Sequence, residues 1–188
     1  MTNRDVIMQI AVELFSQKGF ENVGIQEICE LSKVSKPTLY YYFGSKNGLL
    51  GEIIADYSRE LFKDVLTAVH YTGDLPLTVN RIVRAHFKYA RRNRYFYRML
   101  LYMVFAPPES NYFKMSNQTL EKEYAILEQL FIKASEDHGN MKNKEKELSA
   151  TILGLINTYI GMWLNGYREL DEELVFSASH QFMHGIFS

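Results

Sequence analysis

The sequence predicts an all-α protein of about nine helices. Apolar residues recur at intervals of three and four along most of the chain, Gly and Pro separate the segments with this pattern, and no stretch has a strand signal. No internal repeat is present. The 188 residues, of which 47% are hydrophobic and 23% charged, suffice for a good core in one or two domains.

The first three predicted helices are short and precede Ser45. In the second of them Ile25, Ile28 and Cys29 share one face, with the spacing that buries a stripe of side chains. A helix this short is stable only when it packs against others. Cys29 is the single cysteine, so no disulfide framework is possible, and we expect it to be a small buried apolar residue.

The third helix has clear signals for its start and for its buried face. Ser35 is suited to cap the helix by accepting a hydrogen bond from the backbone N–H of Thr38. Pro37 falls in the first turn, where a helix does not use the N–H that proline lacks. Leu39 and Phe43 are four residues apart, so both are expected to face the core.

The other side chains of the third helix remain at an exposed edge. They are Lys36, Pro37, Thr38, Tyr40, Tyr41 and Tyr42. In a helix-turn-helix the second helix enters the major groove of DNA by its N-terminal residues, while hydroxyls, amines and helix N-termini hold phosphates. Ser45 begins the next helix, and Lys46 in its first turn adds a cation to an already positive helix end. The pattern predicts a helix-turn-helix that binds DNA.

The N-terminal residues resemble the tetracycline-repressor (TetR) family of bacterial transcriptional regulators. The resemblance is carried by Ile10, Ala11, Leu14, Phe15, Gly19, Ile28, the run 34–43, Ser45, Lys46 and Leu49. It covers roughly the first fifty residues, and only architecture links the rest. It implies a helix-turn-helix DNA-binding domain at residues 1–46, a ligand-binding and dimerisation domain at 47–188, and a repressor that a small molecule releases from its operator.

The resemblance also implies roles for single residues. The DNA-binding set is Gln26, Ser35, Lys36, Pro37, Thr38, Tyr40, Tyr41, Tyr42 and Lys46. Lys36 is expected to read guanine acceptors and Tyr41 a thymine methyl, with secondary base contacts from Pro37 and Gln26. Thr38, Tyr40, Tyr42 and Lys46 resemble the phosphate anchors. The alternative for Tyr40 and Tyr42 is packing against the first and fourth helices with only the hydroxyl exposed.

Three departures from the family pattern lie at the edges of this motif. Gly24 stands where the family usually has a capping Ser or Thr, and Lys33 replaces the glycine of the turn. Gly48 stands where an acid would complete a capping box with Ser45. Each departure is expected to cost about 0.5 to 1 kcal/mol of local stability.

The net charge of −1 is unevenly distributed along the chain. Residues 1–50 carry five basic and five acidic residues, whereas residues 81–108 carry seven basic residues and no acid. Part of the basic segment lies on one helical face, formed by Arg81, Arg84, Lys88 and Arg91, opposite Val79, Ile82, His86 and Ala90. We interpret this basic face as a solvated surface and do not assign it to DNA.

Six further helices are predicted after the third. They are expected at about 45–71, 74–93, 95–106, 112–137, 144–167 and 171–187, separated by Gly73, Pro107-Pro108, Gly139-Asn140 and Gly166. The helix at 95–106 is apolar on nearly every side, so we expect it to be enclosed.

Residues around that helix could line a cavity for a ligand. The candidates are Phe62, Leu66, His70, His86, Tyr89, Arg98, Met99, Met103, Tyr124 and Leu127. Thioethers and aromatic rings suit an adaptable site, and they favour an apolar or aromatic effector, including a cationic or acyl-chain compound. Ordinary close-packed core is the alternative for each residue. Arg98 is the lone cation within the apolar run 95–105, and its burial would require a neighbouring Glu or an acidic ligand.

The last two helices predict a homodimer. Their apolar stripes are wider than a terminal hairpin can bury, and Gly154 and Gly161 allow another helix to approach closely. A two-fold pair would place two recognition helices about 34 Å apart, so we expect a palindromic or near-palindromic operator.

Other functions have weaker support in the sequence. No Glu-x-x-His pair, phosphate loop or serine elbow occurs, so we expect no enzymatic activity and no cofactor. His180 and His184 have a spacing that could ligate zinc, which leaves a metal-binding helical enzyme as one alternative. A helical adaptor that binds protein and not DNA is the other alternative. No leader and no membrane span is recognised, so the protein is expected in the cytoplasm.

Overall fold

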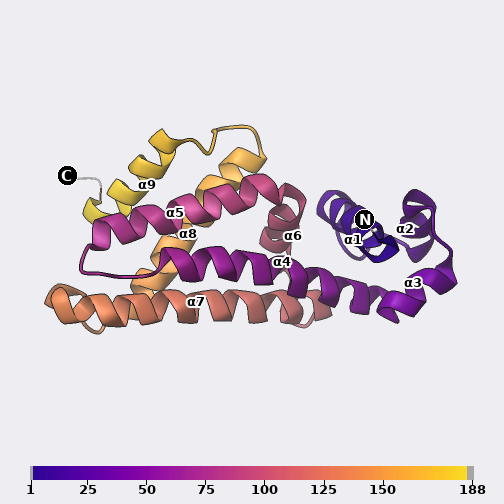
Figure 1. Ribbon diagram of the computed structural model, residues 1–188, viewed down its shortest axis with the longest axis horizontal. Helices are drawn as coiled ribbons and strands as arrows, with labels where there is room; N and C mark the ends of the chain where they lie inside the picture. Colours follow the sequence, from indigo (N-terminus) through magenta and orange to yellow (C-terminus); the bar gives the residue numbers. More distant parts are fainter. Residues whose placement is uncertain (1, 186–188) are drawn as a thin grey trace. The chain divides into compact units, whose positions relative to one another are not determined.

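The computed structural model describes residues 2–185, which form nine α-helices, one 3-10 turn and no strand (Figure 1). The helices are α1 (Asn3–Lys18), α2 (Ile25–Ser32), α3 (Lys36–Phe43), α4 (Lys46–Ala68), α5 (Leu75–Arg92), α6 (Arg94–Val104), α7 (Asn111–Asp137), α8 (Glu145–Leu164) and α9 (Glu172–His184), with η1 (Gly139–Met141) between α7 and α8. The predicted all-α fold class is confirmed. Within the described residues no helix is both long and apolar enough to cross a bilayer.

Two helices end three residues earlier than the sequence predicts. α4 stops at Ala68, three residues short of the expected end, and the freed carbonyl of His70 accepts a hydrogen bond from Arg81 at 2.5 Å. α8 stops at Leu164 because Gly166 has a φ of 78°, and the N–H of Tyr167 closes the helix end on the carbonyl of Met162. The expected end of the last helix, at residue 187, lies outside the described residues.

The chain divides into two compact units. The first consists of residues 1–59 and 93–119, and the second of residues 60–92 and 120–188. Of the three boundaries, one lies between α5 and α6 and two fall inside long helices, so α4 and α7 each contribute their first part to one unit and their second part to the other. This division differs from the boundary at residue 46 that the sequence suggests, and the functional division at that point stays a prediction.

The first unit is built around α1, which packs against α2, α3 and α6. Phe15 is 1% exposed and meets Phe20 edge-to-face, with ring centroids 5.1 Å apart. Tyr112, at the start of α7, lies 6.0 Å from Phe20 and 6.5 Å from Tyr102 of α6, measured between ring centroids. This aromatic cluster joins α1 and the residues directly after it to α6 and to the first turn of α7.

Helix α6 is less enclosed than its composition suggests. One face is buried and consists of Phe96, Tyr97, Met99, Leu100 and Met103. On the other side Tyr102 is 57% exposed, and Phe105, directly after the helix, is 86% exposed. The expectation that this helix is enclosed on nearly every side was therefore wrong, because α6 packs through a single stripe and the exposed Tyr102 can keep its hydroxyl in water.

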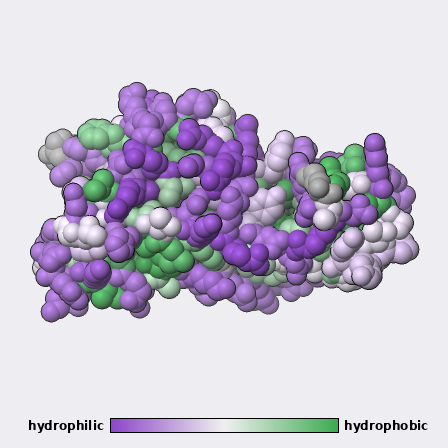
Figure 2. Space-filling model, in the orientation of Figure 1, coloured by the Kyte–Doolittle hydropathy of each residue, from purple (hydrophilic) through white to green (hydrophobic). Residues whose placement is uncertain are grey.

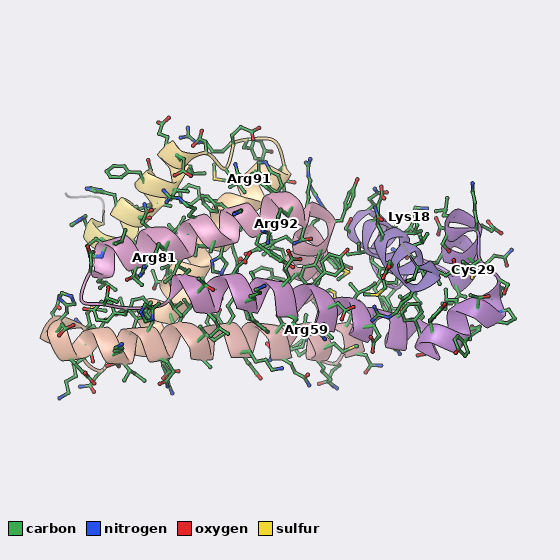
Figure 3. The ribbon with its side chains drawn as sticks, viewed as in Figure 1. Lys18, Cys29, Arg59, Arg81, Arg91 and Arg92 are labelled. Atoms are coloured by element: carbon green, nitrogen blue, oxygen red, sulfur yellow. The ribbon has the colours of Figure 1, made fainter. Side chains whose placement is uncertain are left out.

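The second unit is built around α5, which packs against α8 and α9. Its apolar face is buried as predicted, while Arg84, Lys88 and Arg91 are exposed on the outside. The surface in Figure 2 is largely hydrophilic, with small hydrophobic patches. Arg92, labelled in Figure 3, connects α5 to α4 through ion pairs of 2.9 Å to Glu60 and 2.7 Å to Asp64. The interpretation of the basic face as mainly solvated is thus confirmed, although Arg81 is half-buried.

Candidate DNA-binding site

The turn between α2 and α3 has a fixed backbone geometry. Lys33 follows α2 in the left-handed conformation, with a φ of 56°, and its N–H bonds to the carbonyl of Glu30 at 3.3 Å. The N–H of Val34 then bonds to the carbonyl of Cys29 at 3.0 Å. Lysine adopts this conformation at a cost that glycine would not have, which agrees with the departure noted at this position.

Ser35 caps α3 as predicted. Its Oγ accepts a hydrogen bond of 3.3 Å from the backbone N–H of Thr38, and it lies 2.8 Å from the hydroxyl oxygen of Thr38. Pro37 is in the first turn, also as predicted. The hydroxyl of Ser35 therefore has a structural role at the start of the helix.

The buried and exposed faces of α3 match the sequence prediction. Leu39 is 0% exposed and Phe43 7%, so these two side chains hold the helix against α1 and α2. On the other side Tyr41 is 84% exposed, Tyr40 47% and Tyr42 39%. The rings of Tyr41 and Tyr42 meet edge-to-face at 5.3 Å. The helix thus presents a row of phenol rings to solvent.

Lys36 and Gln26 lie together although they come from different helices. The Nζ of Lys36 donates to the Oε1 of Gln26 at 3.4 Å, and the Nε2 of Gln26 donates to Glu30 at 3.0 Å. Both side chains are exposed. The fold therefore brings together two of the residues predicted to contact bases, at the N-terminal end of α3 and on the first turn of α2.

Lys46 is held at the start of α4. Its Nζ lies 4.3 Å above the ring of Phe20 and donates to the carbonyl of Glu21 at 3.4 Å. Burial lowers the pKa of this amine, and the charge of Glu21 only partly opposes that effect. The contacts hold the amine of the first residue of α4 against the segment between α1 and α2.

Gly48 is required by close packing and does not simply weaken a cap. A Cβ atom at this position would lie 2.0 Å from the carbonyl oxygen of Phe43, well inside contact distance. The N–H of Gly48 donates to the Oγ of Ser45 at 2.9 Å, so Ser45 still caps α4 without an acid three residues later. The expected loss of stability at Gly48 was wrong, because a side chain there would collide with the end of α3.

The residues predicted to bind ligand are divided between the two units. Arg98, Met99 and Met103 belong to the first, and Phe62, Leu66, His70, His86, Tyr89, Tyr124 and Leu127 to the second. His86, Tyr89 and Leu127 are 0% exposed, whereas Leu66 and His70 are exposed and line an open groove. A role in ligand binding stays a prediction for all ten.

His86 forms a buried pair with Glu123, which the sequence analysis missed. Its Nδ1 donates to the carbonyl of Ile82 at 2.8 Å, and its Nε2 lies 2.6 Å from Oε1 of Glu123. Because a carbonyl can only accept, the Nε2···Oε1 contact must hold one proton, on either the imidazole or the carboxyl group. Glu123 lies four residues after the buried Thr119 and four before the buried Leu127, so helical spacing could have identified it.

The charge of this pair follows from two opposing effects. Burial by itself lowers the pKa of His86, because it disfavours the charged imidazolium. The hydrogen bond to Glu123 and the charge of that carboxylate outweigh burial and raise the pKa above the usual value for histidine. The pair is therefore held as a proton-containing, net neutral pair inside the second unit.

His180 and His184 lie beside each other on α9, with ring centroids 4.6 Å apart. No group of three or more His, Cys, Asp or Glu side chains able to hold a metal ion occurs among the described residues. Within that part of the chain, the geometry places two imidazoles together without a third ligand of these types nearby.

Comparison with known proteins agrees with this geometry. Residues 7–53 match the family described as bacterial regulatory proteins, tetR family. This segment spans most of α1, all of α2 and α3 and the start of α4. Over 185 residues the chain is 24% identical to the HTH-type transcriptional activator FasR of Mycolicibacterium smegmatis, an alignment that covers 97% of this chain and 81% of FasR.

Solved structures share the fold over nearly the whole chain. The TetR family regulator PfmR from Thermus thermophilus superimposes with a TM-score of 0.77 at 23% identity, covering 97% of this chain and 99% of PfmR. FadR from Bacillus subtilis, solved in complex with stearoyl-CoA, superimposes with a TM-score of 0.80 at 16% identity, covering 97% and 98%. Residues 7–53 thus match the tetR family of bacterial regulatory proteins, and this match together with the named relative identifies the chain as a DNA-binding transcriptional regulator similar to members of that family.

Proposed function

We propose that this protein is a homodimeric repressor that binds a palindromic operator through α3 and is released by a small-molecule effector. The observation that carries the proposal is the exposed edge of α3. Tyr41 is 84% exposed while Leu39, two residues earlier, is 0% exposed, so the helix is firmly anchored and still offers its polar edge to a partner. A short, exposed helix of this kind fits the width of the DNA major groove.

Single residues at this edge have separate proposed roles. Lys36 and Tyr41 read bases, with Gln26 beside Lys36 and Pro37 at the helix start as secondary contacts. Thr38, Tyr40, Tyr42 and Lys46 hold phosphates, as do the exposed backbone and hydroxyl near Ser35. Residues 1–50 carry five basic and five acidic residues, so their net charge attracts DNA little. DNA binding therefore depends on where each single amine lies relative to the phosphates.

The proposed dimer forms through α8 and α9. Within the chain Ile152, Ile156 and Ile160 are 0% exposed, so α8 already uses one face for its own core. Its other face leaves Met162 37% exposed, and α9 leaves Phe176 65% exposed. A second copy would cover this surface, and Gly154, which has no atom within 4 Å of its Cβ position, would let the helices approach closely.

The proposed effector is an apolar molecule that binds to the second unit and changes the spacing of the two recognition helices. The stearoyl-CoA complex of FadR supports an acyl-chain compound as the chemical class. α4 is the proposed lever, because it begins beside α3 and continues into the second unit. The effector can act only through a difference in its affinity for the two arrangements.

Selection of bound sequences from random duplex DNA tests the DNA-binding part of the proposal. We expect enrichment of two inverted half-sites whose centres lie about 10 base pairs, or a multiple of this, apart. Enrichment of a single, non-repeated site, or of no sequence, would contradict the palindromic operator. A mobility shift on the selected site, repeated with acyl compounds, then tests release, and an operator affinity unchanged by every compound that binds the protein would refute the switch.

A further inference from the structure

The second halves of α4 and α7 form an open groove within the second unit. The groove has a volume of about 500 Å³, inside the range of roughly 300 to 1,000 Å³ that is common for small-molecule sites. Figure 2 shows a hydrophobic patch on the surface over the C-terminal part of α4. Leu66, which lines the groove, is 56% exposed.

The lining of the groove changes character along its length. Leu66 lies near the end of α4 and Val69 directly follows the helix, and both line the groove together with Ile126 and Leu130 of α7. These four side chains form an aliphatic floor. The polar lining consists of His70 and Tyr71, just after α4, and of Gln129 and Lys133 in the second half of α7. Among the described residues, no carboxylate lines the groove.

Hydrogen bonds around Tyr71 show that His70 and Lys133 lie at the same end. The Nζ of Lys133 donates to the carbonyl of Tyr71 at 3.2 Å, so the end of α4 meets the last turns of α7. The hydroxyl of Tyr71 donates to the Oδ2 of Asp137 at 2.8 Å, so the carboxylate of Asp137, close to this end, has Tyr71 as its hydrogen-bond partner. Lys133 forms no ion pair with any residue between 2 and 185. The groove thus has an aliphatic floor and a cationic end.

We propose that this groove binds an aliphatic chain that ends in an anionic head group. The chain lies along Leu66 and Ile126, and the head group is held by Lys133 and His70. Charge complementarity selects the anion, because the described lining carries an amine without an ion pair and no acid. The proposal rests on the function proposed above in one respect, since it gives the acyl-chain effector an anionic head group and a location. Two of the residues predicted to bind ligand, Leu66 and His70, belong to this groove, whereas His86 and Tyr89 are closed inside the core.

Calorimetric titration of the full chain with decanoate and with uncharged 1-decanol tests the groove. Lys133→Glu should weaken decanoate binding by about tenfold or more and leave 1-decanol unaffected, because it reverses the charge at the head-group end. Leu66→Asp should weaken both ligands. Lys122→Glu and Leu77→Asp are the matched controls for the charge reversal and for the apolar-to-acidic change. Both residues are exposed on helices and lie outside the groove, so these two variants should bind decanoate and 1-decanol as the wild type does.

The outcomes separate this inference from the proposed function. Equal binding to wild type and to both groove variants, or no binding of decanoate to wild type, would overturn the groove as the ligand site. A change of oligomeric state in Leu66→Asp would also overturn it, because a second copy of the chain would then cover the groove. Operator binding by the ligand-free wild type is measured in parallel. If the ligand-free wild type does not bind an operator, the proposed function is refuted, while decanoate binding in the groove would still stand.

Discussion

Single residues determine local stability at two places in this protein. At the junction of α3 and α4, the absence of a side chain at Gly48 lets the backbone of the two helices come together. In the core of the second unit, His86 and Glu123 are 0% and 3% exposed and satisfy each other. An added methyl group at Gly48 or a lost partner in the His86–Glu123 pair should therefore destabilise the fold, because close-packed and buried polar sites compensate poorly for such changes.

Gly48→Ala should destabilise the protein by about 1 to 3 kcal/mol, because the new methyl group must displace the carbonyl of Phe43. Chemical unfolding in urea measures the change. Gly51→Ala is the matched control on the same helix, since its methyl group would meet only the flexible end of Met115, at 3.1 Å. The control should be neutral or slightly stabilising, through its higher helix propensity. Equal destabilisation of the two variants would contradict the contact.

The His86–Glu123 pair should make stability depend on pH. Because the folded pKa of His86 is raised, the contribution of the pair is fully present below the unfolded pKa of about 6.5. It is lost as pH rises through the folded pKa, so the free energy of unfolding should fall above neutrality. Urea unfolding at a series of pH values between about 6 and 9 measures this slope.

Glu123→Gln distinguishes this pair from other titrating groups. The amide can donate a hydrogen bond to the neutral imidazole of His86, so the contact is kept while its proton linkage is lost. The slope of stability with pH should therefore become shallower in this variant. His70→Gln alters an exposed histidine and should keep the wild-type slope. A wild-type slope in Glu123→Gln would show that other groups cause the pH dependence.

At the scale of elements, α3 depends on its neighbours for its position. The helix has eight residues, too few to be stable alone, and it is held by the Ser35 cap, by Leu39 and by Phe43. The turn before it contains Lys33 in a left-handed conformation, and the contact after it depends on Gly48. These constraints fix the direction of the exposed edge, which is what groove recognition requires.

Substitutions in α3 and α4 should separate base reading from phosphate binding. Lys36→Ala should reduce the free energy of operator binding by roughly 1 to 3 kcal/mol and relax specificity at one base position. Lys46→Ala should weaken binding to all sequences alike and reduce the dependence of affinity on salt concentration. Fluorescence anisotropy with the selected operator and with single-base variants, at several salt concentrations, measures both effects. Identical salt slopes for wild type and Lys46→Ala would contradict the phosphate contact.

At the scale of the whole molecule, we expect function to depend on a second copy of the chain. The apolar residues of α8 and α9 are only partly used within the chain, and Phe176 and Met162 remain exposed. An operator with two half-sites needs two recognition helices in a defined relation, which a monomer cannot supply. Dimer formation and DNA binding should therefore be lost together.

Gly154→Phe should weaken the dimer, because a large ring would occupy the space through which the partner helix approaches. The Cβ position of Gly154 has no neighbour within 4 Å, so a side chain can leave the helix at this residue without a collision at its first atom. Size-exclusion chromatography at micromolar concentration measures the result. Gly139→Phe is the matched control, since its Cβ position is equally open but lies outside α8 and α9. A dimeric Gly154→Phe variant would exclude close packing at this residue.

Short-range patterns explain why much of the candidate site could be predicted. Ser35, Pro37, Leu39 and Phe43 lie within nine residues of one another, and capping and helical spacing are local properties. Contacts between distant residues could not be predicted in the same way. The pairing of His86 with Glu123 joins residues 37 positions apart, and the groove at Leu66 and Lys133 joins two helices with another two between them.

The sequence by itself determined the all-α fold class, the nine helices of the described chain and the polar edge of α3, because these depend on periodicity, caps and turn residues within a few positions. Only the tertiary structure decided that α6 is covered on one face, that Gly48 is needed for a close contact, and that Lys46 sits above Phe20. The physical reason is that burial, collision and charge pairing depend on which residues meet in space, and packing brings together side chains that are far apart along the chain.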